Sequence, residues 1–190
     1  MIKTLQIISA SCLLIIFSCN SPIEKKTLKA PQTIVQDTCN SYFDYDELDH
    51  FYLNIDHDAL WNTEKKDGKT LKEKKQLELL LQWTPEKISD SIVVKNLEGL
   101  DFIKTEISPG KFGEINKIFC ERKHKEVFMN SCIAEYRDIL IFKKENKIIG
   151  IAKLSFSCEQ NVVIGTTLNT SEFGQSGDYK KLYDLLHPHL

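Results

Sequence analysis

The chain has 190 residues, of which 42% are hydrophobic and 27% are charged, and its net charge at pH 7 is −2. This mild acidity excludes the concentrated basic face that binding to nucleic acid requires, so we expect no nucleic-acid partner. It also excludes attachment to anionic lipid through a cluster of basic residues.

The N-terminus has the order of parts of an export signal. Lys3 precedes the run 5–17, which is apolar apart from Gln6 and two serines. This run is too short to cross a bilayer as a helix and has the length of the apolar part of a signal peptide. It ends at Ile16-Phe17-Ser18-Cys19, which resembles the lipobox of bacterial lipoproteins.

The resemblance implies cleavage before Cys19 and attachment of a diacylglyceryl group to its sulfur. Two or three acyl chains, palmitate among them, then hold the protein at the membrane. In such families Asn20, rather than aspartate, permits transfer to the outer membrane of a Gram-negative cell. The alternative is an ordinary secretory signal in which Cys19 stays unmodified.

These features predict three parts: a signal peptide in residues 1–18, a tether in residues 19–40, and one globular domain in residues 41–190. The tether is polar, contains Pro22 and Pro31, and lacks a sustained hydrophobic period. About 150 residues suffice for one domain with its own core.

The first half of the domain reads as helical. Apolar residues recur at close to helical spacing in 46–61 and 70–83. Thr84-Pro85 and Ser108-Pro109 each offer an N-cap followed by proline, which predicts a short element at the first and a helix through Phe119 at the second. Ile92–Val94 is β-branched and predicts a short strand.

The second half reads as an antiparallel meander over 133–168. Runs 139–142 and 147–156 flank Lys144-Glu145-Asn146, a predicted hairpin loop, and 162–168 is a third strand. The strand face that includes Tyr136 and Leu140 is predicted to meet the core. The other face is predicted to be covered only near the turn. A final helix is expected from Ser176-Gly177-Asp178 to Leu186, so the fold class is α+β: N-terminal helices on an antiparallel meander of three or more strands, with a C-terminal helix.

Four cysteines follow Cys19, and two disulfides are predicted among them in an exported protein: Cys39, Cys120, Cys132 and Cys158. Three pairings are possible. A three-residue hairpin loop sets Cys132 opposite Cys158, whereas a two-residue loop sets them diagonally. Their spacings match no zinc motif, and no metal or other cofactor is expected.

Few residues suggest a catalytic or ligand-binding role. Asp138 shares its strand face with Tyr136 and Leu140, and an apolar setting is where a carboxylate acquires a functional pKa. The favoured alternative is an ion pair or a place at the end of the sheet. The acidic stretch 44–58, with His50 and His57, is interpreted as a solvated helix face, and His187-Pro188-His189 as a frayed end.

The segment from Cys132 to Cys158, with Arg137-Asp138, Asn146-Lys147 and Ser157-Cys158, resembles the C-terminal hairpin of small uncharacterised bacterial lipoproteins. This resemblance implies fold and export, not activity.

The sequence therefore predicts a non-enzymatic, lipid-anchored envelope module that binds a protein or cell-wall partner. One alternative is an envelope hydrolase that uses Asp138 and a histidine brought near by folding. Another is an immunity or inhibitor lipoprotein.

Overall fold

A five-stranded antiparallel sheet lies at the centre of the described part of the computed structural model, which comprises residues 39–188 except 125 and 129. Cys19, the signal peptide, His189 and all of the tether before Cys39 lie outside this part. The elements are β1 (Asn40–Ser41), β2 (Glu47–Tyr52), α1 (His57–Lys65), α2 (Leu71–Leu81), η1 (Ile88–Val94), η2 (Glu98–Leu100), β3 (Ile103–Glu106), η3 (Pro109–Lys111), α3 (Phe112–Ile118), β4 (Cys120–Glu121), β5 (Asp138–Lys144), β6 (Lys147–Ser155), β7 (Gln160–Ile164) and α4 (Asp178–Leu186).

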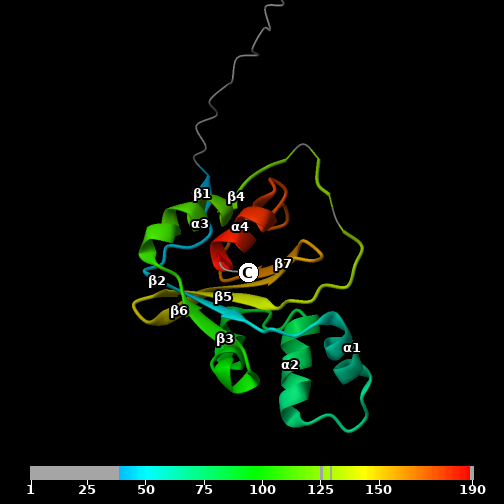
Figure 1. Cartoon of the computed structure of the whole chain (residues 1–190). Helices are drawn as coiled ribbons and strands as arrows, with labels where there is room; N and C mark the ends of the chain where they lie inside the picture. The colour runs from blue at the N-terminus through cyan, green and yellow to red at the C-terminus, as the bar shows by residue number, and fades with distance from the viewer. Residues whose placement is uncertain (1–38, 125, 129, 189–190) are drawn as a thin grey trace, which may run out of the picture. The chain divides into compact units, whose positions relative to one another are not determined.

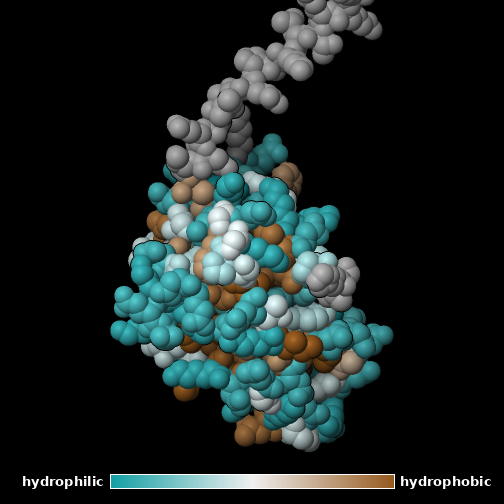
Figure 2. All heavy atoms as spheres, turned by 60° about the vertical axis from the view of Figure 1, so that its left-hand side comes forward, coloured by the Kyte–Doolittle hydropathy of each residue, from teal (hydrophilic) through white to brown (hydrophobic). Residues whose placement is uncertain are grey.

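The sheet has the order β3-β2-β5-β6-β7, and β1 pairs separately with β4. Helices α3 and α4 lie on one side of the large sheet, and α1 and α2 lie on the other (Figure 1). The α+β class, the meander and the C-terminal helix are therefore confirmed. The space-filling view shows small hydrophobic groups scattered between hydrophilic residues (Figure 2).

The predicted helix over 46–61 is wrong. Residues 47–52 form β2, which lies between β3 and β5, and α1 begins only at His57. Alternate residues of β2 face opposite sides, so Leu48 packs with α3 and α4 while Phe51 packs with α1 and α2. The alternation is hidden in the sequence because Asp49 and His50 are polar and yet buried.

The predicted helix at 70–83 is confirmed as α2, which begins with a capping box between Thr70 and Glu73. The helix after Ser108-Pro109 is confirmed as η3 and α3. Thr84-Pro85 does not start a helix and lies between α2 and η1. The predicted strand at Ile92–Val94 is wrong, since these residues belong to the 3₁₀ helix η1.

The β5–β6 hairpin has a two-residue loop, Glu145-Asn146, in which both residues have positive φ. This is the backbone of a type I′ turn, whose twist matches that of paired strands. A bulge between Phe142 and Lys143 shifts the register further, so Asp138 pairs with Leu154 and not with Ala152. The predicted register was wrong by two residues from Asp138 to Phe142, which keeps these side chains on their predicted faces, and by one residue at Lys143 and Lys144. Beyond the bulge the alternation is broken, because Ile148 packs in the core with α1 and α2 whereas Ile149 packs in the core with α3 and α4.

Two disulfides join the four cysteines in the described part, Cys39 to Cys120 and Cys132 to Cys158. The second pair is the one that the predicted register favoured, although β5 begins only at Asp138, so Cys132 lies outside the ladder. Its two Cα atoms are 5.9 Å apart, within the usual range for a disulfide.

Both faces of the sheet are covered, contrary to the prediction that one is covered only near the turn. Ile139, Ile141 and Ile151 pack against α1 and α2 in one core. Lys153 and Ser155 continue the same face of β6, and both are fully buried. This face is polar at one end because folding supplies partners there, not because it meets water.

Candidate functional site

The described residues bring Asp138 together with two histidines. The Nε2 atoms of His50 on β2 and His187 after α4 both donate to the Oδ1 atom of Asp138, at 2.8 and 2.7 Å. All three side chains are buried. His50 is therefore not part of a solvated helix face, and His187 is not part of a frayed end. The group fastens the end of α4 to the central strands.

Aromatic rings close this group off around His187. Tyr52 and Tyr183 lie with their ring centroids 4.9 and 4.7 Å from that of His187, and Phe156 lies at 6.2 Å. Burial raises the pKa of the Tyr52 hydroxyl, and the nearby charge of Asp138 adds to this. A substrate would have to displace these rings to reach the carboxylate.

The donor atoms of His50, Asp138 and His187 lie within 4.8 Å of one another, and these residue types can ligate a metal ion. However, the Nδ1 atom of His50 is buried and has no hydrogen-bond partner among the described residues. A metal-ligating histidine almost always donates its second N–H to an acceptor. Without such an acceptor at Nδ1 of His50, the group fits a hydrogen-bonded clamp better than a metal centre.

A second polar group surrounds Glu135. His57 Nδ1 lies 2.6 Å and Trp61 Nε1 3.0 Å from its Oε1 atom, and Arg137 donates to Oε2. Burial raises the pKa of this carboxyl, but the hydrogen bonds outweigh burial and the net shift is downward. The group borders a hollow of about 680 Å³ next to the Cys132–Cys158 disulfide. His57 therefore faces Glu135, which lies 78 residues later in the chain, and it is not paired with His50.

A third feature is a groove of about 400 Å³, which we call the aromatic groove. Its volume lies within the range of about 300 to 1,000 Å³ that is typical of small-molecule sites. Among the described residues that line it, Glu159 alone is charged. The others include five aromatic residues and a set of amides and hydroxyls: Trp83, Phe128, Tyr136, Phe173, Tyr179, Asn130, Gln160, Asn161, Thr170, Ser171 and Gln175.

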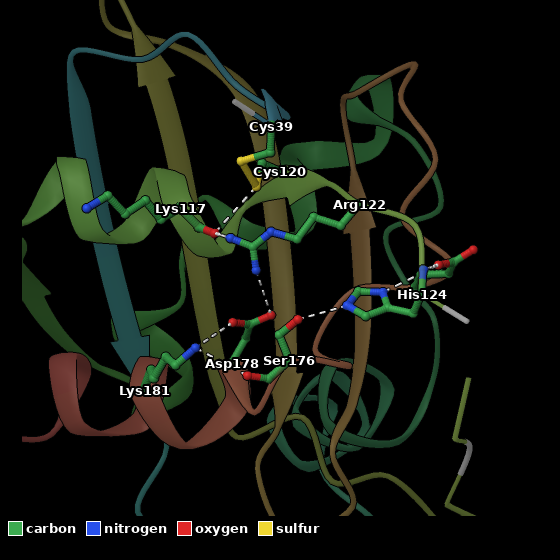
Figure 3. Close-up of polar contacts among 9 residues, drawn as sticks. Cys39, Lys117, Cys120, Arg122, His124, Ser176, Asp178 and Lys181 are labelled. Atoms are coloured by element: carbon green, nitrogen blue, oxygen red, sulfur yellow. Dashed lines mark hydrogen bonds and ion pairs between the residues drawn. A yellow bond between two sulfur atoms is a disulfide. The ribbon is translucent and has the colours of Figure 1, made fainter. Parts of the chain in front are cut away.

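Two aromatic residues of the groove are strongly exposed, Trp83 by 73% and Phe128 by 72%. The backbone of Phe128 is nevertheless fixed, because its N–H donates to Gln175 Oε1 at 2.7 Å and its carbonyl accepts from Gln175 Nε2 at 2.8 Å. The preceding segment is held to the start of α4, where His124 Nε2 lies 2.8 Å from Ser176 Oγ and Arg122 Nη1 lies 3.5 Å from Asp178 Oδ2 (Figure 3).

A buried lysine holds the backbone on both sides of Trp83. Lys153 Nζ donates to the backbone carbonyls of Gln82 and Thr84, at 2.5 and 2.8 Å, which flank Trp83 on both sides. The same ammonium group lies 4.8 Å from the ring centroid of Tyr136. Burial raises the pKa of the Tyr136 hydroxyl, and a side-chain hydrogen bond with Trp83 opposes this shift. Lys153 therefore holds the backbone on both sides of the exposed indole.

Burial lowers the pKa of Lys153 to about 7, so this lysine makes stability depend on pH. The unfolded chain, with a lysine pKa of about 10.4, binds more protons than the folded chain between the two values. The free energy of unfolding should therefore rise by about 2 kcal/mol between pH 7 and pH 9.

Urea denaturation at pH 7, 8 and 9 measures this slope. Lys153→Met should flatten it, whereas Lys147→Met, at an exposed position of β6, should leave it unchanged. An unchanged slope in Lys153→Met would show that other groups cause it.

Sequence reasoning singled out Asp138 but missed His187, Lys153 and Trp83 as parts of a site. A lysine that continues the apolar face of Ile149 and Ile151 was the available signal for burial of Lys153. Nothing in the local sequence indicated that its partners are the backbone carbonyls beside Trp83, which lies 70 residues earlier in the chain.

Among the described residues, no helix has the length and apolar character needed to span a membrane. Comparisons of the chain with protein-family models, with curated proteins and with solved structures found no match.

Proposed function

We propose that this protein is a lipid-anchored protein of the cell envelope that binds its partner in the aromatic groove and catalyses no reaction. The observation that carries this proposal is the exposure of Trp83 and Phe128 on backbone segments that hydrogen bonds hold in place. Exposed aromatic side chains in defined positions are typical of binding surfaces, where they contribute contact area at a low entropic cost. Neutral amides around them supply orientation, as in other small-molecule sites.

The anchor rests on the lipobox-like sequence at Cys19. The Cys39–Cys120 and Cys132–Cys158 disulfides suit an exported protein, because such bonds persist in oxidising compartments. Together these features support a domain held at the outer membrane by its acyl chains, with its groove available to a protein or a cell-wall component.

Site-specific photo-crosslinking in intact cells tests the binding function. A photoreactive residue at Phe128 should give either a discrete protein adduct or an adduct that sediments with the cell wall. The same residue at Ile103, which is exposed on β3 outside the groove, should give neither. A discrete protein adduct would favour an immunity or inhibitor lipoprotein. Equal labelling from both positions would contradict a role for the groove.

Metabolic labelling with radioactive palmitate tests the anchor. The protein should incorporate the label, and Cys19→Ser should abolish it and move the protein from the membrane pellet to the soluble fraction. The physical reason is that each buried methylene of an acyl chain contributes about 0.8 kcal/mol to membrane binding. Wild-type protein that stays unlabelled would contradict the lipobox interpretation.

A second candidate function, an envelope hydrolase, has one observation in its favour: folding does bring histidines to Asp138. Both Nε2 atoms are committed to this one carboxylate oxygen, and the rings around His187 close the group. We therefore rank this candidate below binding, and the stability and turnover of Asp138 variants separate the two.

A further inference from the structure

We infer that the ligand of the aromatic groove is an uncharged, hydroxyl-rich oligosaccharide, and that Lys153 positions Trp83 as the platform on which a sugar ring stacks. This inference rests on the proposed function of the groove as a binding surface. It adds the chemical class of the ligand and the residue that prepares the site.

The charge of the groove argues for a neutral ligand. Lysine, arginine and histidine are absent from its described lining, so an anionic ligand would find no counter-charge there. Glu159 alone is charged, and its Oε2 atom already lies 3.3 Å from Asn130 Nδ2. A single carboxylate that accepts a hydrogen bond suits a hydroxyl donor as well as it suits a cation.

The polar groups of the groove argue for a ligand rich in donors. Asn130 Nδ2 donates to the Cys158 carbonyl, and Gln160 Nε2 donates to the carbonyls of Asn130 and Cys132. Asn161 Nδ2 donates to the Tyr179 hydroxyl. The amide nitrogens of these three residues are thus used within the protein, and their side-chain oxygens remain as acceptors, whereas both the oxygen and the nitrogen of the Gln175 amide already bond to Phe128. Sugar hydroxyls can donate hydrogen bonds to the oxygens of those three residues.

The aromatic groups argue for rings that stack. The C–H face of a pyranose packs against an aromatic plane while its hydroxyls point outward to planar amides. Trp83 offers the largest such plane, and its exposure leaves the plane open to a ligand. A peptide would instead pair with the backbone of the edge strand β7, whose residues 160–163 line the groove, and a discrete protein adduct in the crosslinking experiment is the outcome that would favour it.

Lys153 is a positioning residue in this scheme. A fully buried lysine is costly unless its hydrogen bonds are satisfied, and the two carbonyls that satisfy this one belong to the residues on either side of Trp83. Methionine at this position fills the same volume but donates no hydrogen bond. The backbone around the indole would then be free to move.

Titration of the full-length protein with chitotriose, cellotriose and maltotriose tests the inference, in a detergent without a sugar headgroup. Incorporation of 5-fluorotryptophan gives two ¹⁹F resonances, one from Trp61 and one from Trp83, and Trp83→Phe assigns them. Saturable binding of at least one trisaccharide should shift the Trp83 resonance and leave that of Trp61 in place. Preference for chitotriose would point to N-acetylated cell-wall glycan, and preference for a glucose trimer to another polysaccharide.

Trp83→Ala should weaken binding at least tenfold, whereas Leu71→Ala, an equally exposed position outside the groove, should not change it. Lys153→Met should weaken binding and broaden the Trp83 resonance while the Trp61 resonance stays sharp, which a general loss of stability would not do. Binding that persists in Trp83→Ala would overturn the inference.

The two proposals fail separately. A groove-specific protein adduct in cells with no binding of any trisaccharide would overturn the glycan inference and leave the binding function standing. Absence of both would overturn both.

Discussion

Asp138→Ala should lower the free energy of unfolding by about 3 to 5 kcal/mol, because it leaves two buried histidine N–H groups without their shared acceptor. His50 and His187 reach no other acceptor through Nε2 among the described contacts. The loss should also loosen the end of α4 from the sheet. Chemical denaturation at pH 7 measures the change.

Two variants control this experiment. Asp138→Asn keeps an Oδ1 acceptor for both histidines and should cost less than half as much. Asp184→Ala removes an exposed carboxylate of α4, paired with Lys180, and should change stability by less than about 0.5 kcal/mol. The hydrolase hypothesis expects the reverse pattern. Nearly unchanged stability in Asp138→Asn, together with loss of a measurable turnover, would make Asp138 a catalytic residue rather than part of a clamp.

Replacing Cys39 and Cys120 together by serine should destabilise the domain by about 4 kcal/mol, the second large effect. The Cys39–Cys120 disulfide closes a loop with a sequence separation of 81, and it joins the start of the described domain to the strand pair β1–β4. A cross-link that closes so long a loop removes much of the conformational freedom of the unfolded chain.

The Cys132–Cys158 disulfide provides the comparison, because its sequence separation is only 26. Chain entropy predicts that its removal costs about 1 kcal/mol less than removal of the longer link. Thermal and urea denaturation of both double variants, with and without reductant, measure the two losses. A larger loss at Cys132–Cys158 would indicate that this bond acts mainly through native packing beside the aromatic groove, and not through the unfolded chain.

Local sequence determined those elements whose signals lie within the element. The capping box at Thr70 and the apolar period after it fixed α2, and the β-branched runs on either side of Glu145-Asn146 fixed the β5–β6 hairpin. The shift of two residues kept the faces from Asp138 to Phe142, because side chains alternate with a period of two. The lipobox-like run before Cys19 is equally local, and it stays a prediction.

The tertiary structure decided which polar residues are buried. Asp49, His50 and Lys153 look like surface residues in sequence, and Asp49 and His50 made a strand resemble an acidic helix. Their burial depends on partners elsewhere in the chain: Lys143 and Lys104 for Asp49, and Asp138 for His50. Burying a charge is far more costly without such a partner than with one, and local sequence does not contain that information.

The candidate site likewise depends partly on local sequence and partly on the tertiary structure. The sequence identified Asp138 as unusual, whereas Lys153 and Trp83 were not predicted as parts of a site. Only the fold brought His187 to Asp138 and the backbone around Trp83 to Lys153. A binding groove is assembled from segments that the chain separates widely, because side chains become neighbours through sheet register and helix packing rather than through sequence distance.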